Sequence, residues 1–237
     1  MKQTKYIVLL IIGSVFTSCG SDFLEPIPTS GITSGSYYTN DAEVETGLIS
    51  IYDAFQGVNS TSTNDNHGVI YEYYLTEMRS DNTRTKSQEG EAAQFEFYTI
   101  EATNGIVANY YASYYNAIFR ANVVLNNLDI IQDANKLAAF EAEAKFCRAY
   151  AYFNLVRLYG SDDDSIGGVP LVTAVVSTDQ EDLLFTRVPK STVYQQIAED
   201  LQEAIVNLDN SYKARASKAA AQGLLAKAYL SQPTPNY

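Results

Sequence analysis

The sequence predicts a mainly all-α fold built from paired helices joined by long loops. A chain of 237 residues with 46% apolar and 19% charged residues can bury a sizeable core. Apolar residues recur every three or four positions over several long segments, which is the spacing of one helix face. The last of these segments, 217–230, is rich in alanine, and small side chains allow two helices to approach closely. These observations together predict helix hairpins stacked on one another.

Residues 1–18 have the features of a signal peptide. Lys2 and Lys5 precede an apolar run of eleven residues, 6–16, which ends in small polar residues. A membrane-spanning helix needs about 20 apolar residues, so this run is typical of an export signal. We therefore expect the chain to leave the cytoplasm.

Cys19 stands directly at the expected cleavage point. The order Phe16-Thr17-Ser18-Cys19 resembles a bacterial lipobox, although Phe16 stands where leucine is usual. We expect Cys19 to become the first mature residue and to carry lipid, since several acyl chains together hold a protein firmly on a membrane. The alternative is an ordinary secretory signal followed by a chance cysteine. Residues 19–40, rich in Pro, Gly and hydroxyl side chains, then form a lipid-anchored tether.

The helical domain is expected over 41–237. Asn40 or Asp41 is the expected cap of its first helix, Gly160 the expected end of the longest one, and Ser191 the expected N-cap of the next. Apolar residues at helical spacing occupy five segments: 41–55, 111–128, 137–158, 193–208 and 217–230.

Polar connections separate these helices. Segments 57–68 and 79–91 are long for links inside one domain, and long ordered loops often bind ligands. A turn-rich stretch that begins with the acidic run Asp162–Asp164 leads into a short extended piece. That run looks like the start of a calcium loop, but Ile166 and Thr173 stand where such a loop needs oxygen ligands. We interpret it as a solvated acidic turn.

The sequence offers little material for catalysis. His67 is the only histidine, in a Ser/Thr/Asn loop, so a solvated histidine is expected rather than a triad member or zinc ligand. No nucleotide-binding glycine motif is present. Cys147 falls on a helix face as a buried thiol, and no internal disulfide forms if Cys19 is processed. We predict no catalytic residue, no metal site and no cofactor.

The charge balance excludes some partners. The 28 acidic residues outnumber 16 basic ones, which leaves a formal net charge of −12. Such a surface repels phosphate backbones and anionic lipid headgroups, so no nucleic-acid binding is expected.

Two tyrosine clusters are candidates for stacking on a sugar ring, because tyrosine combines a flat apolar face with a polar tip. Core packing is expected for Tyr110, Tyr111, Tyr114 and Tyr115, since two of them belong to a helical stripe. The first cluster instead borders the polar segment 79–91. The candidate ligand-binding residues are therefore Tyr71, Tyr73, Asp81, Asn82 and Arg84.

Several motifs carry a family resemblance. The helix EAKFCRAYAYFNLVRLYG, followed by GGVPLVT, resembles the signature of SusD/RagB outer-membrane lipoproteins, with 161–166 inserted in the turn. Three further stretches agree in order: CGSDFLEP, YYNAIFRANVVLNNLD, and the pair VPKSTVYQQIAEDLQEAIVNL with ASKAAAQGLLAKAYL. The resemblance covers essentially the whole chain after Cys19.

The resemblance implies tetratricopeptide-like helix hairpins and a lipoprotein anchored at the cell outer membrane and exposed on the surface. It implies a non-enzymatic protein that captures oligosaccharides, or in some cases peptides, and passes them to a SusC-like TonB-dependent transporter. Family members are longer, so the chain resembles their N-terminal helical portion, truncated at the C-terminus.

Two other functions stay open. A helical-repeat scaffold would dock on the transporter without binding a small ligand. A secreted all-helical glycoside hydrolase needs only two carboxylates, and 28 acidic residues make a chance pair unavoidable. Binding and product-release measurements would separate these alternatives.

Overall fold

The computed structural model describes residues 37–57, 67–163, 165–176, 185–211 and 214–233. Cys19, the expected signal peptide and most of the expected tether lie outside these residues. Within the described ranges the β structure is one isolated bridge, between Pro170 and Arg187. The helices are α3 (Asp41–Gln56), α4 (Gly68–Leu75), η3 (Glu77–Arg79), α5 (Ala93–Glu96), α6 (Gly105–Leu125), η4 (Leu128–Ile130), α7 (Ala134–Tyr159), α9 (Lys190–Asn207) and α10 (Lys218–Ser231).

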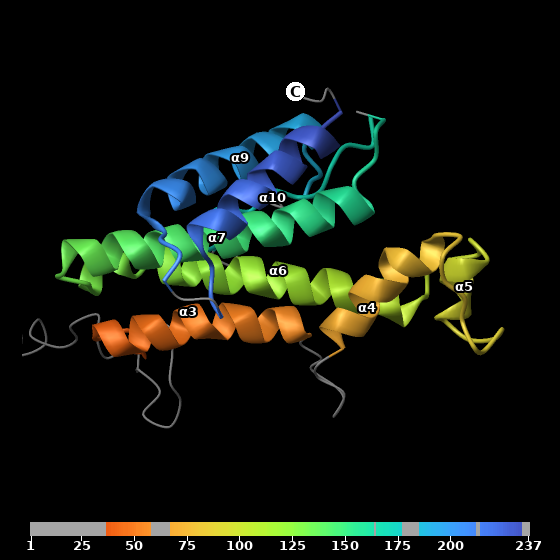
Figure 1. The fold of residues 1–237 in the computed structure, drawn as a ribbon, viewed down its shortest axis with the longest axis horizontal. Helices are drawn as coiled ribbons and strands as arrows, with labels where there is room; N and C mark the ends of the chain where they lie inside the picture. Colours follow the sequence, from red (N-terminus) through yellow and green to blue (C-terminus); the bar gives the residue numbers. More distant parts are fainter. Residues whose placement is uncertain (1–36, 58–66, 164, 177–184, 212–213, 234–237) are drawn as a thin grey trace, which may run out of the picture. The chain divides into compact units, whose positions relative to one another are not determined.

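The long helices pack on one another in chain order (Figure 1). α3 packs against α6, α6 against α7, α7 against α9, and α9 against α10. The all-α prediction of stacked helix pairs is confirmed. α7 also touches α3 and α10, which explains why its apolar stripe is wide enough to be buried on more than one side.

Polar caps explain where several helices begin. The Asn40 side chain accepts hydrogen bonds from the first turn of α3, and Asn104, Asp133 and Ser217 do the same for α6, α7 and α10. The prediction of Ser191 as the cap of α9 is wrong. The carbonyl of Pro189 already accepts the first helical bonds of α9, so Ser191 lies inside the first turn.

The small residues of α10 do not play the expected role. Ala221 and Ala228 are buried with Leu224, whereas Ala219, Ala220 and Gly223 are exposed. The close packing of α10 on α9 therefore depends on one helical stripe and not on the whole alanine run. The short helices α4 and α5 were not expected, because eight and four residues are too few to show a clear helical period.

Core packing of the second tyrosine cluster is confirmed. Tyr110 and Tyr114 are buried with ring centroids 4.3 Å apart, and Tyr111 and Tyr115 are half-buried at 4.6 Å. Among the described residues, no helix is both long enough and apolar enough to cross a bilayer.

The extended segment 167–176 is held by side chains and not by a sheet. The Tyr115 hydroxyl donates to the Pro170 carbonyl at 2.8 Å. The Tyr152 hydroxyl donates to the Val172 carbonyl at 2.8 Å and accepts from the Val172 N–H at 2.6 Å. α6 and α7 thus satisfy the polar backbone groups that a neighbouring strand would otherwise satisfy.

Candidate functional site

The five candidate binding residues lie on α4 and on the loop that follows η3. Tyr71 is half-buried, with its ring centroid 4.3 Å from that of His67. Tyr73 is 39% exposed, so it is the α4 tyrosine whose face is more open to a ligand. Asp81, Asn82 and Arg84 are exposed. The structure therefore places the tyrosines on a helix and the polar residues on a loop one short helix later.

Two short hydrogen bonds fix the conformation of this loop. The Thr83 hydroxyl donates to the Glu77 carbonyl at 2.6 Å, and the Thr85 N–H donates to the Glu96 carboxylate at 2.7 Å. The side chains of Asp81, Asn82 and Arg84 make no hydrogen bond or ion pair with the part of the chain that the structure describes. Their polar groups are therefore available to a ligand.

A second exposed aromatic segment follows α5. Phe97, Tyr98 and Ile100 are 47%, 67% and 41% exposed. Tyr98 has a φ of 56°, the one positive φ of a non-glycine residue in the described ranges. Its hydroxyl donates to the Arg79 carbonyl, which ties the segment to η3. Aromatic residues in this conformation are rare and occur where surrounding contacts hold them, often at binding sites.

Sequence reasoning missed Tyr98. The available signal was the aromatic run FEFYT, which carries Phe95, Phe97 and Tyr98 within four positions. Tyr98 also lines a cavity of about 390 Å³ together with Leu75, Thr76, Arg79, Arg157 and Leu158. Three separate parts of the chain thus meet there: the end of α4 with η3, the segment after α5, and the end of α7.

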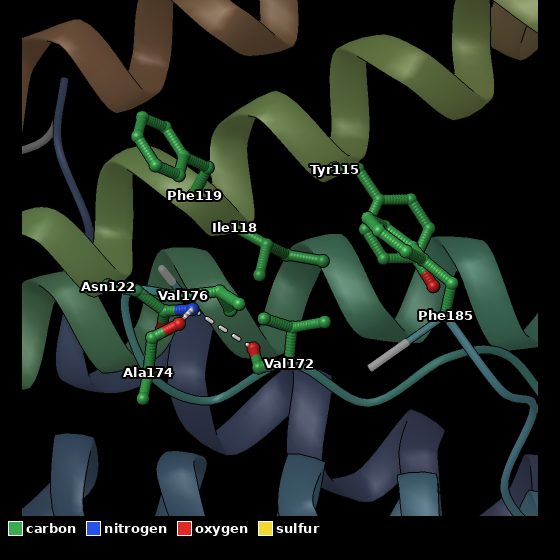
Figure 2. A pocket seen from close by; sticks show the side chains of 8 residues that line it. All are labelled: Tyr115, Ile118, Phe119, Asn122, Val172, Ala174, Val176 and Phe185. Atoms are coloured by element: carbon green, nitrogen blue, oxygen red, sulfur yellow. Dashed lines mark hydrogen bonds between the residues drawn. The ribbon is translucent and has the colours of Figure 1, made fainter. Parts of the chain in front are cut away.

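A different, apolar cavity of about 200 Å³ lies between α6 and the segment after α7 (Figure 2). Phe119 and Phe185, which line it, are 54% and 63% exposed. Asn122 is its main polar side chain, but its amide donates to the carbonyls of Val172 at 3.0 Å and Ala174 at 3.3 Å. The remaining lining residues are Tyr115, Ile118 and Val176. This surface suits an apolar group and offers a sugar few hydrogen bonds.

A buried ion pair between α7 and α9 fixes residues beside this apolar cavity. Arg148 of α7 donates to both carboxylate oxygens of Asp200 in α9, at 2.8 and 2.7 Å. The same guanidinium donates to the Asn122 side chain at 2.9 Å and to the Thr173 carbonyl at 3.1 Å. Burial opposes the charge, but the hydrogen bonds and charge of Asp200 outweigh it and raise the pKa of Arg148. Arg148 and Tyr152 of the signature helix therefore hold segment 167–176.

The expectation for His67 is wrong. The side chain is 6% exposed, because His67 directly precedes α4 and its ring packs beside Gly57 and the tilted ring of Tyr71. Its Nε2 lies 3.4 Å from the hydroxyl of Ser113 in α6. His67 therefore packs inside the fold as part of the support for Tyr71.

The acidic turn and the helix cysteine act structurally. Asp162 pairs with Lys190 of α9 at 2.5 Å, so the inserted turn is attached to the start of that helix. Cys147 is 1% exposed, and burial raises the pKa of its thiol to about 12. Within the described ranges, no group of three or more His, Cys, Asp or Glu side chains could hold a metal ion.

The sequence matches a known protein family and several of its curated members. A SusD-like family model described as "Starch-binding associating with outer membrane" matches residues 23–230. Among curated proteins, SusD-like protein P2 of Formosa agariphila is 29% identical over 98% of this chain and 44% of its own length. A SusD-like protein of Bacteroides ovatus is 25% identical over 97% of this chain and 40% of its own length.

Solved structures share the fold. A laminarin-binding SusD-like protein matches with a TM-score of 0.64 and 30% identity, over 81% of this chain and 40% of that one. A SusD-like carbohydrate-binding protein from Bacteroides vulgatus matches with a TM-score of 0.69 at 21% identity, over 81% of this chain and 42% of that one. The chain thus spans less than half the length of these relatives. The family match over most of the sequence, together with the shared helical architecture, shows that this chain belongs to the SusD-like family.

Proposed function

We propose that the chain acts in a cell-surface lipoprotein that captures glycans, or in some cases peptides, and passes them to a SusC-like TonB-dependent transporter. One observation supports glycan binding. Between residues 71 and 98, a SusD-like helical fold exposes aromatic rings beside polar side chains that make no hydrogen bond with the described residues. Tyr73 and Tyr98 would stack on sugar rings. Asp81, Asn82 and Arg84 would hydrogen-bond sugar hydroxyls.

The proposed role is to hold the ligand without cleaving it. The candidate polar side chains Asp81, Asn82 and Arg84 come from one loop and contain a single carboxyl group, whereas glycoside hydrolysis uses two. A glycoside hydrolase would instead release products from a polysaccharide. Product analysis after prolonged incubation with starch and laminarin tests this directly, and released oligosaccharide would contradict the proposal.

Calorimetric titration with starch and laminarin oligosaccharides tests the binding surface. Tyr73→Ala and Asp81→Ala should each weaken binding about tenfold, since each removes one stacking face or one charged hydrogen-bond partner. Phe119→Ala is the matched control, because it removes another exposed ring, from the apolar cavity of Figure 2. If Phe119→Ala abolishes binding while Tyr73→Ala and Asp81→Ala do not, the glycan site has been placed on the wrong surface.

The proposed outer-membrane anchor is lipid on Cys19. Labelled palmitate should enter the wild-type chain and be absent from Cys19→Ala. Cys147→Ala is the control, because this second cysteine is buried in α7 and should keep the label unchanged. Lipid that persists in Cys19→Ala would exclude this anchor and leave an ordinary secretory signal.

A helical-repeat scaffold is the second candidate function, favoured by the exposed rings of Phe119 and Phe185. A scaffold would co-purify with the transporter, lose it in Phe119→Ala, and bind no member of a panel of oligosaccharides and peptides. A ligand-binding protein would bind at least one panel member. Co-purification and titration of the same preparations therefore separate the two candidates.

A further inference from the structure

The cavity of about 390 Å³ beside η3 presents two arginines to the same space. Arg79 comes from η3, and Arg157 comes from the last turns of α7, 78 positions later in the chain. Both side chains are exposed, so their guanidinium groups can be reached from solvent. Leu75 and Leu158 add apolar surface to the wall, and Tyr98 adds an aromatic ring.

Neither arginine is neutralised by a carboxylate in the described part of the chain. Arg157 donates to the Asn154 side chain at 3.2 Å, and its guanidinium lies 5.2 Å from the Phe153 ring centroid. The cations that do pair with carboxylates are Arg120, Lys136, Lys145, Arg148, Lys190 and Arg215.

Tyr98 holds one side of the cavity in place. Its hydroxyl bonds to the backbone of Arg79, and its backbone keeps the left-handed conformation with φ of 56°. Such a conformation is strained in a non-glycine residue, so surrounding contacts must maintain it. The result is an exposed aromatic face next to two guanidinium groups.

We infer that this cavity binds the anionic substituent of an acidic glycan, either a uronate carboxylate or a sulfate ester. The planar guanidinium offers paired N–H donors that match the oxygens of both groups, and Tyr98 offers a face for the sugar ring that carries them. The net charge of −12 does not prevent this, because exposed charges beyond about 8 Å are largely screened at physiological ionic strength. The inference rests on the proposed glycan binding and specifies its ligand class.

Titration of the full chain carrying Cys19→Ala tests the inference with three probes of equal length: an oligogalacturonate, a sulfated galactan oligosaccharide and a neutral laminarin oligosaccharide. At least one acidic probe should bind about tenfold more tightly than the neutral one. Its affinity should fall as salt rises, because an ion pair is screened. The two acidic probes separate the carboxylate from the sulfate source, and preferential binding of either supports the inference.

Arg79→Gln and Arg157→Gln should each weaken binding of the acidic probe about tenfold and reduce its salt dependence. Both side chains are exposed, so the variants should fold, which circular dichroism checks. Lys227→Gln on α10 removes one positive charge elsewhere and should change neither quantity. Unchanged binding in both arginine variants, or equal affinity for acidic and neutral probes, would overturn the inference.

The same titrations distinguish this inference from the proposed function. Neutral oligosaccharide that binds through Tyr73 and Asp81, with no preference for acidic probes, leaves glycan binding intact and rejects the acidic ligand class. Absence of binding by every probe rejects both.

Discussion

Arg148 in α7 and Asp200 in α9 form a two-pronged ion pair, with donor–acceptor distances of 2.8 and 2.7 Å and side chains only 6% and 3% exposed. Removing one partner leaves the other charge buried without compensation. Asp200→Asn and Arg148→Met should therefore each lower the free energy of unfolding by about 3–5 kcal/mol. Urea unfolding at 25 °C measures this loss.

The exposed pair between the same two helices is the control. Lys145 of α7 also pairs with Glu203 of α9, whose side chain is 59% exposed. Surface pairs contribute about 0–1 kcal/mol, so Glu203→Gln should change stability little. Equal losses in Glu203→Gln and Asp200→Asn would mean that burial does not set the contribution of the Arg148 pair.

Tyr152 and Tyr110 are both fully buried, but their hydroxyls differ in bonding. The Tyr152 hydroxyl makes two hydrogen bonds to Val172, whereas that of Tyr110 has no hydrogen-bond partner in the described ranges. Tyr152→Phe should cost about 1–3 kcal/mol because it leaves backbone groups of Val172 unsatisfied. Tyr110→Phe should be neutral or stabilising. Thermal unfolding of both variants gives the comparison, and equal destabilisation would contradict it.

The Cys147 thiol should be unreactive in the folded protein. Burial raises its pKa to about 12, against about 8.5 for an ordinary thiol. With Cys19→Ala as background, Cys147 is the sole thiol and should react with a disulfide reagent at pH 8 only after unfolding. Rapid labelling of the native chain at pH 8 would contradict its burial.

The raised pKa of Cys147 makes the stability of the folded chain depend on pH. The folded chain keeps the Cys147 proton up to about pH 12, whereas the unfolded chain loses it near pH 8.5. Its contribution to stability is therefore complete below pH 8.5 and falls by up to about 1.4 kcal/mol per pH unit above it. Cys147→Ser removes this slope. Urea unfolding at pH 8, 9 and 10 measures the free energy of unfolding. This free energy should fall less steeply with rising pH in Cys147→Ser than in the chain that keeps Cys147.

Two glycines should respond in opposite directions to alanine. Gly167 has a φ of 78°, and an added Cβ would lie 2.8 Å from the Val188 carbonyl oxygen, so Gly167→Ala should cost about 1–3 kcal/mol. Gly223 is in α10 with open space around its Cα, so Gly223→Ala should gain about 0.4–1 kcal/mol. A loss of stability in Gly223→Ala would show an unrecognised packing role for this position.

Local patterns in the sequence determined the helices. Apolar spacing placed α3, α7 and α9 to within a few residues, and Asn40 and Gly160 marked true helix ends, because a buried helix face and its caps involve neighbours within about four positions. The signature motifs also identified the family, since they appear in order along the chain.

Tertiary structure decided what separate segments do together. The polar residues before His67 in the sequence predicted a solvated side chain, and only its contacts with Tyr71 and with Ser113 of α6 bury it. Arg148 meets Asp200 across 52 positions, and no helical period links residues so far apart. The candidate ligand surface depends on the same effect. The contact of the left-handed Tyr98 with the Arg79 carbonyl joins residues 19 positions apart, and the cavity that Arg79 shares with Arg157 joins residues 78 positions apart.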